Sequence, residues 1–230
     1  YLSADAEQIV ACSDSYRVTI WKKSDSGWKY RKESEHQMPS GRLLAIEPDA
    51  EKFVYRINDH ETKTSRVTLV DATTGEQLGE FEGARDVAAF SPDGKTLISY
   101  GEHWSWHPET TISLYDAQTC QLIRKLEFGP WEVEEAAFHP DGDRLLVSCE
   151  LHLAKQLAED PDNETWQTMA LSREAVRLWD AHTGEKLHTL TGHRWPVTDL
   201  EFSPDGKRLL TTSFDRTNLL DVASGQRLFQ

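Results

Sequence analysis

Two histidines, His103 and His107, stand four residues apart, a spacing that lets two imidazoles share a metal ion across one helical turn. Pro108 follows them at once and disfavours a helix, and no third ligand is evident, so we expect no metal site. The acidic run 132–135 predicts a solvated surface, and the alternative is a docking site for a basic peptide. No nucleophile motif, phosphate-binding glycine loop or paired carboxylates appear. The sequence therefore predicts no catalytic residue and no cofactor.

Tryptophan and arginine, which are enriched at the hot spots of protein interfaces, gather in a few segments outside the strand pattern. The loop 101–108 carries two tryptophans, and others stand just before apolar stretches. For Trp131 and Trp195 the alternative of packing under neighbouring loops stays open. We predict a partner-binding rim made of Arg85, His103, Trp104, Trp106, Trp131, Trp166, Arg194 and Trp195.

A recurring turn motif positions these segments. Ser-Pro-Asp-Gly, or a near variant of it, stands at 3–6, 47–50, 91–94, 139–142 and 203–206. The aspartates of successive motifs lie 44, 44, 48 and 64 residues apart. Proline presets φ and glycine permits a positive φ, so each motif is expected to reverse the chain tightly. A period of this size indicates an array of one supersecondary unit.

Short β-branched or aromatic segments bounded by turn residues surround each motif and predict strands. One apolar stretch precedes the motif, a second follows it, a third ends near an aspartate, and a fourth comes after a glycine turn. We therefore predict an all-β fold of four-stranded antiparallel sheets, the first of which lacks its innermost strand. The expected repeats are 1–38, 39–83, 84–129, 130–191 and 192–230, within a single domain or segment, 1–230.

The combined pattern resembles the WD-repeat family of β-propellers. The best copy reads Val-Arg-Leu-Trp-Asp-Ala-His-Thr-Gly at 176–184 and runs into Thr-Gly-His at 191–193. The resemblance covers nearly the whole chain, in five degenerate copies; Leu220, for example, replaces the strand tryptophan. It implies a β-propeller and a buried hydrogen-bonded tetrad that stabilises the fold. The residues expected in such structural roles are Trp179, His193, Ser213 and Asp215.

The loop between the second and third strands varies in length. From the turn aspartate to the third-strand anchor the distances are 16, 21, 22, 38 and 15 residues. In a propeller of this type these loops and the segments leading into the first strand share one rim, and insertions on one face mark a binding face. We therefore expect a non-enzymatic scaffold that binds a protein or peptide through this rim. The alternatives are a catalytic or small-molecule-binding propeller, quinoprotein-like or hydrolase-associated, and a purely structural domain of a regulatory protein.

The composition of the chain excludes some classes of binding partner. The net charge of −14 repels phosphate backbones, so no nucleic acid is expected, and no apolar run reaches the roughly 18 residues of a membrane span. Three cysteines without metal-binding spacing favour the cytoplasm, with Cys12 and Cys149 buried in strands. Because the first repeat lacks a strand, we expect a segment of a longer chain with further repeats or fused domains. A closed five-bladed ring is the alternative.

Overall fold

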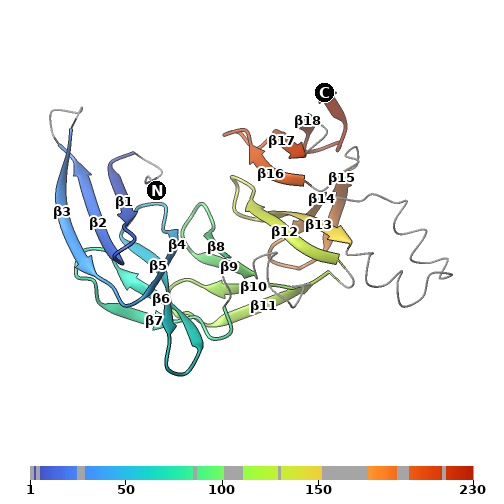
Figure 1. Ribbon diagram of the computed structural model, residues 1–230. Helices are drawn as coiled ribbons and strands as arrows, with labels where there is room; N and C mark the ends of the chain where they lie inside the picture. The colour runs from blue at the N-terminus through green and yellow to red at the C-terminus, as the bar shows by residue number, and fades with distance from the viewer. Residues whose placement is uncertain are drawn as a thin grey trace. The chain divides into compact units, whose positions relative to one another are not determined.

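The computed structural model describes residues 3, 6–24, 29–84, 87–100, 111–128, 131–151, 176–190, 197–213 and 216–229, whose regular structure is all β (Figure 1). The chain divides into two compact units. The first comprises Tyr1–Tyr100 and Ser113–Lys125, and the second comprises Gly101–Ile112 and Leu126–Gln230. Each unit is described by itself.

The first unit holds two sheets and most of a third, each a meander of antiparallel neighbours. The first sheet consists of β1 (Gln8–Cys12), β2 (Arg17–Lys23) and β3 (Tyr30–Gln37). The second consists of β4 (Gly41–Ile46), β5 (Lys52–Asp59), β6 (Thr64–Asp71) and β7 (Gln77–Glu80). The third consists of β8 (Val87–Phe90), β9 (Thr96–Tyr100), β10 (Thr111–Asp116) and β11 (Leu122–Glu127).

The second unit holds two further four-stranded sheets. The fourth sheet consists of β12 (Trp131–Phe138), β13 (Arg144–Leu151), β14 (Val176–Asp180) and β15 (Lys186–Leu190). The fifth consists of β16 (Val197–Phe202), β17 (Arg208–Ser213), β18 (Thr217–Asp221) and β19 (Arg227–Phe229). The prediction of an all-β chain made of four-stranded antiparallel sheets, with three strands in the first, is confirmed.

Neighbouring sheets within a unit enclose the apolar core. Between the first two sheets, Val10 and Val18 pack against a cluster that includes Phe53 and Val70. Leu69, Phe81 and Tyr115 belong to the cluster shared by the second and third sheets, and Leu146, Leu178 and Leu209 to the one shared by the fourth and fifth. Burying one such side chain contributes about 1.5–3 kcal/mol, so the apolar stripes of the strands drive the stacking of sheets.

The second repeat accommodates its extra residues differently from the expectation. They were expected in a longer loop after the second strand. Instead β5 and β6 pair continuously from Lys52↔Asp71 to Asp59↔Thr64, and the turn occupies 60–63. In the first repeat, by comparison, β1 ends at Cys12 and β2 starts at Arg17. The insertion is therefore a longer hairpin, because its alternating residues can extend the hydrogen-bonded ladder.

Each Pro-Asp-Gly turn is closed by its own side chains. Ser91 donates to Asp93 Oδ1 at 2.7 Å and accepts the Thr96 amide at 2.9 Å, while the Lys95 amide donates to Asp93 Oδ1 at 3.1 Å. Gly94 follows in the left-handed region with φ +72°. The fifth repeat repeats these bonds with Ser203 and Asp205. Because every contact is local, the four-residue motif is enough to specify the reversal.

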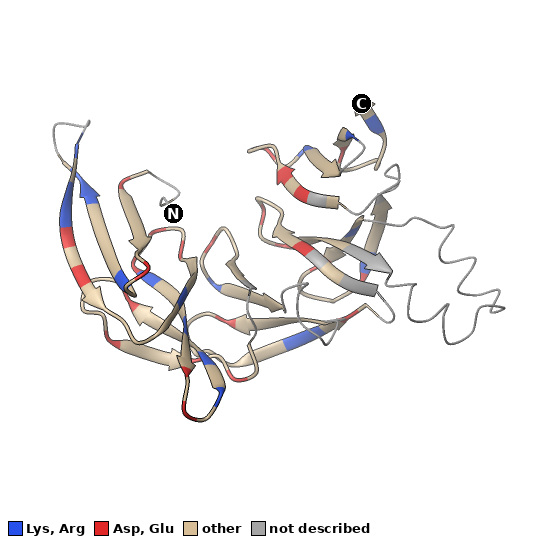
Figure 2. Cartoon of the chain, in the orientation of Figure 1, with Lys and Arg blue, Asp and Glu red and all other residues tan. Residues whose placement is uncertain are grey.

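In the second to fifth repeats a second aspartate closes the turn that follows the third strand. Asp71 accepts the Thr74 amide at 2.7 Å and the Thr73 amide at 2.9 Å, and these bonds lower its pKa. Figure 2 shows acidic residues at many of the turns between strands. Cys120 takes a positive φ of 58° after the third-repeat turn, at the position where other repeats have glycine. The carboxylates that accept turn amides as Asp71 does are those of Asp116, Asp180 and Asp221.

Two repeats have a larger residue in place of the turn serine, and that residue reaches the neighbouring sheet. His139 is almost fully buried, and the Asp141 amide donates to its Nδ1 at 3.2 Å. Nε2 donates to the Gly206 carbonyl at 2.8 Å. Its ring also meets Phe202 edge to face, with centroids 4.9 Å apart. In the first unit Glu47 packs against Gly94 in the same way. These contacts link the turn of one repeat to that of the next.

Replacing Gly206 should test this link. Gly206→Ala is expected to lower the free energy of unfolding by about 3 kcal/mol, because it combines a left-handed φ with overlap between the new Cβ and the His139 ring. Gly83→Ala, at φ +74° with Tyr115 Oη 4.0 Å away, should cost only about 1 kcal/mol. Urea denaturation measures both. Adding His139→Ser should restore part of the loss in Gly206→Ala, and no recovery would contradict the steric cause.

Acid should destabilise the fold through the turn aspartates. The Ser91 hydroxyl and the Lys95 amide hold the pKa of Asp93 at about 2. A carboxyl group with a lowered pKa contributes stability above its unfolded pKa, about 3.9, and that stability is lost as the pH falls through the folded value. We expect the urea midpoint to fall between pH 4 and pH 2. In Asp93→Asn the fall should be smaller.

Glu47 provides the control of opposite sign. Burial raises the pKa of its carboxyl group, despite Lys52 Nζ 3.0 Å away. A raised pKa means that protonation favours the folded state, so stability from this group rises as the pH falls. The acid loss in Glu47→Gln should therefore be at least as large as in the wild-type chain. An equal reduction in both variants would contradict the assignment to Asp93.

Candidate partner-binding surface

Most of the predicted rim lies outside the described residues. Trp131 is the first residue of β12, and its side chain is also outside what the structure describes. The structure therefore does not test whether these side chains meet, and they stay a prediction. The seven others are Arg85, His103, Trp104, Trp106, Trp166, Arg194 and Trp195.

The structure does describe the same class of loops in the first unit. We name the segments 13–16, 38–42 and 58–64 the first-unit rim; they follow β1, lead into β4 and join β5 to β6. The Met38 amide donates to the Tyr16 carbonyl at 2.9 Å, and the Asn58 amide donates to the Ser40 carbonyl at 2.7 Å. Ser40 Oγ and His60 Nε2 lie 2.8 Å apart. Loops after second strands and segments leading into first strands thus meet on one side of this unit, as expected.

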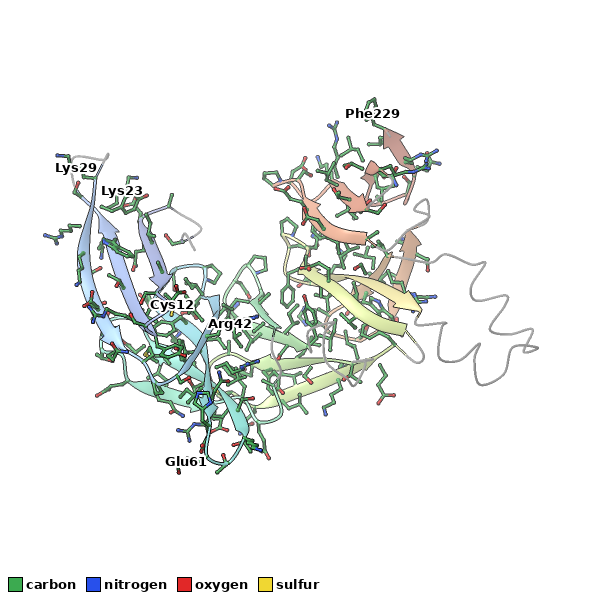
Figure 3. All side chains as sticks on the ribbon, viewed as in Figure 1. Cys12, Lys23, Lys29, Arg42, Glu61 and Phe229 are labelled. Atoms are coloured by element: carbon green, nitrogen blue, oxygen red, sulfur yellow. The ribbon has the colours of Figure 1, made fainter. Side chains whose placement is uncertain are left out.

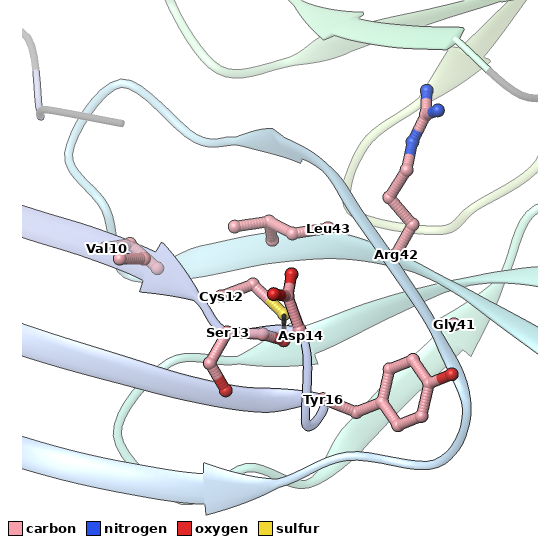
Figure 4. Close-up of a pocket in the computed structure, with 9 residues that line it drawn as sticks. Val10, Cys12, Ser13, Asp14, Tyr16, Gly41, Arg42 and Leu43 are labelled. Atoms are coloured by element: carbon pink, nitrogen blue, oxygen red, sulfur yellow. Dashed lines mark hydrogen bonds between the residues drawn. The ribbon is translucent and has the colours of Figure 1, made fainter.

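Two hollows open on this rim. Figure 3 labels Cys12 and Arg42 beside the first hollow and Glu61 at the tip of the β5–β6 hairpin, beside the second. The second is a cavity of about 450 Å³ lined by the ends of β5 and β6 and their turn. The first, the β1–β4 pocket, is a cavity of about 520 Å³ (Figure 4) lined by Val10, Ala11, Cys12, Ser13, Asp14, Tyr16, Gly41, Arg42 and Leu43.

A buried tyrosine and a glycine fix the mouth of the β1–β4 pocket. Tyr55 on β5 is fully buried, and its hydroxyl donates to the Pro39 carbonyl at 3.0 Å. Burial raises the pKa of this hydroxyl, so it stays a donor. Gly41 must lack a side chain, because a Cβ there would overlap the carbonyl oxygen of Arg56 on the paired strand. The segment that leads into β4 is therefore held in place by residues of β5.

The electrostatics of the pocket centre on Cys12 and Asp14. Cys12 is half-buried and donates to the Ser13 carbonyl at 3.6 Å, and burial, with a smaller contribution from the charge of Asp14, raises its pKa. The thiol is therefore protonated at neutral pH and a poor nucleophile. Asp14 is exposed, and within the part of the chain that the structure describes its carboxylate has no hydrogen bond and no ion pair.

The four residues expected in structural tetrad roles are only partly described. Ser213 is buried at the end of β17, and Trp179 on β14 meets Phe128 edge to face at 4.9 Å. Trp179 Nε1 is buried without a hydrogen-bond partner among the described residues. His193 and Asp215 lie outside the described residues, so the tetrad remains a prediction. In the same described part of the chain no cluster of His, Cys, Asp and Glu is arranged to hold a metal, and no helix could span a membrane.

Comparison with known proteins identifies the family to which one of the repeated four-stranded units is similar. The family described as "WD domain, G-beta repeat" matches residues 184–219. This segment starts at the Thr-Gly turn of the fourth repeat and runs through β15, β16 and β17 into β18, the length of one repeat. The matched segment is a WD repeat, and the other sheets of the chain repeat its antiparallel plan. Ser213 and the predicted residues His193 and Asp215 all belong to the matched WD repeat.

Similar proteins cover most of the chain. "Nuclear distribution protein PAC1" of Arthroderma benhamiae is 27% identical over 219 residues, which are 91% of this chain and 45% of that protein. "Serine-threonine kinase receptor-associated protein" of Gallus gallus is 25% identical over 191 residues, 80% of this chain and 45% of that protein. "Transducin beta-like protein 3" of Bos taurus is 24% identical, covering 66% and 22%. The chain thus spans less than half of these relatives.

Sequence reasoning missed the β1–β4 pocket. It favoured the long loops, whereas Asp14 lies in one of the shortest, between β1 and β2. A signal that could have pointed to the pocket is Gly41, because a glycine at the start of an apolar strand indicates a close approach of backbones. The absence of a partner for Asp14 among the described residues is a tertiary property that no local pattern reports.

Removing one hydroxyl should test how the pocket mouth is held. Tyr55→Phe is expected to lower the free energy of unfolding by about 1–2 kcal/mol, since the Pro39 carbonyl loses its donor. Tyr16→Phe is the matched control, because Tyr16 is 38% exposed and should cost almost nothing. Urea denaturation compares the two. Equal stabilities for both variants would show that the Tyr55 hydroxyl does not hold the segment.

Proposed function

We propose that this chain is a non-enzymatic β-propeller scaffold that binds a protein or peptide partner through a loop-rich rim. The observation that carries the proposal is the first-unit rim, where three loops from two repeats bond to one another and border two hollows, one between the repeats and one on the β5–β6 hairpin. A surface assembled by loops on a rigid sheet scaffold is suited to recognition. The name of one relative, "Serine-threonine kinase receptor-associated protein", describes association with another protein, and we extend that kind of role to this chain.

The equivalence of repeats extends the rim to the predicted tryptophans and arginines. The segment 101–110 follows β9 and the segment 152–175 follows β13, as 13–16 follows β1. The segments before β8, β12 and β16 correspond to 38–40 before β4. By this correspondence seven of the eight predicted residues belong to loops of the class that meets in the first-unit rim, and Trp131 stands at the start of β12, directly after such a loop. Tryptophan and arginine at such positions supply large contact areas and strong anchors.

We further propose that residues 1–230 act as a single WD-repeat segment and that the chain works in the cytoplasm. Each repeat of such an array depends on its neighbours for core packing, which favours one cooperative body over separate domains. Cys12 and Cys120 are free thiols, the usual state in a reducing compartment.

A triple variant tests the rim. Trp104→Ala/Trp106→Ala/Trp195→Ala is expected to reduce recovery of the partners that the wild-type chain captures from cell extract by at least about tenfold, since a single hot-spot residue contributes about 2 kcal/mol or more. Quantitative mass spectrometry of the captured proteins provides the measurement.

The matched control is Leu78→Ala/Leu122→Ala/Leu187→Ala, which removes exposed apolar side chains from the outer strands β7, β11 and β15. It should retain the partners. The far-UV circular dichroism spectra of both variants should match that of the wild-type chain. Unchanged partners in the tryptophan variant, with its fold intact, would remove the rim from the proposal.

A further inference from the structure

We propose that the β1–β4 pocket receives one positively charged side chain, lysine or arginine, from a protein partner, and that Asp14 is its anionic anchor. The inference rests on the proposed function and adds the chemistry that the rim recognises. It depends on three observations: the shape of the pocket, the state of Asp14 and the charge of the chain.

The pocket has the size and walls for a long amphipathic side chain. Its volume of about 520 Å³ is in the usual range for ligand pockets, about 300–1,000 Å³. Val10 and Leu43 give it a buried apolar floor, and the ring of Tyr16 lies beside Gly41 at one end (Figure 4). The methylene stem of lysine or arginine lies well on such a floor while its head stays polar.

Asp14 differs from the aspartates of the turns. Those carboxylates accept backbone amides of their own turns, as Asp71 and Asp93 do. Asp14 has neither a hydrogen bond nor an ion pair within the described residues, although it lines the pocket. In Figure 4 its carboxylate lies beside Cys12, at the centre of the lining residues. A carboxylate without a partner in this position is ready to pair with an incoming cation.

The turn that carries Asp14 is held in place before any ligand arrives. Ser13 Oγ lies 2.9 Å from Ser15 Oγ and accepts the Arg17 amide at 3.3 Å. Gln37 Nε2 donates to the Ser15 carbonyl at 2.8 Å, and Tyr16 adopts a left-handed φ of 61°. Because the turn is fixed from both sides, little conformational entropy is lost on binding.

Arg42 is the charge of opposite sign on the lining, and it makes an anionic ligand the competing possibility. Its guanidinium points away from the Asp14 carboxylate in Figure 4, and it already takes part in another interaction. The net charge of −14 also draws cations rather than anions toward the surface. Asp14 is therefore the charge that a ligand meets unpaired, and a cation is the favoured occupant.

Titration with small amides tests the pocket on the whole chain. N-acetyl-arginine methylamide should shift the backbone amide resonances of 10–16 and 41–43 in ¹H–¹⁵N spectra, with a Kd on the order of 1 mM. N-acetyl-citrulline methylamide, nearly the same shape without the charge, should bind at least about tenfold more weakly. Asp14→Asn should weaken the arginine amide by a similar factor. Asp199→Asn, which changes an exposed aspartate on β16, should leave it unchanged.

Three outcomes would overturn the inference. They are equal binding of the citrulline and arginine amides, unchanged binding by Asp14→Asn, and shifts at the same amides with N-acetyl-glutamate methylamide alone. The tryptophan variant reports separately on the rim. If the arginine amide does not bind but partner capture still depends on the tryptophans, the pocket assignment fails and the proposed function stands. If the amide binds and partner capture ignores the tryptophans, the rim proposal fails alone.

Discussion

A hydrogen-bonded aspartate in two recurring turns, the one before the second strand and the one after the third, is the constraint on which the rest of the structure depends. Asp93 and Asp205 close the turn between the first and second strands, and Asp71 and its equivalents close the turn between the third and fourth. Each carboxylate satisfies amides that the strand ladder leaves without partners. With both turns fixed, the pairing register of the strands follows, and each apolar residue is directed to one face of its sheet.

Fixed turns also determine how sheets meet within a unit. Where the turn serine is kept, as at Ser91, its hydroxyl bonds inside its own turn. Where His139 or Glu47 replaces it, the side chain reaches a glycine of the next repeat. The same position thus serves either local closure or contact between repeats. The glycines at these contacts are constrained twice, by a positive φ and by the ring or carboxylate packed against them, so a side chain at Gly206 would be costly in this arrangement.

The sequence predicted those features whose causes are local. The four-residue turns, the strands at Gln8–Cys12 and Arg208–Ser213, and the antiparallel order all follow from nearby residues. The number of inserted residues in the second repeat could not reveal that they pair as strands. The same number of residues can form either a longer loop or a longer hairpin. The contact of His139 with Gly206 spans 67 residues and needs two sheets to be stacked first. The rim tryptophans remain predictions, and the β1–β4 pocket was missed.

The distribution of paired and unpaired carboxylates connects the scaffold to the binding surface. A net charge of −14 suggests a uniformly acidic surface, yet many aspartates are already bonded to turn amides. Such a carboxylate would have to give up its backbone donors to pair with a partner, and that loss offsets much of the gain from a new ion pair. Within the described residues Asp14 has no such bonds to lose. Recognition by charge is therefore expected where the turn pattern is absent, and in the first unit the short loop between β1 and β2 is such a place.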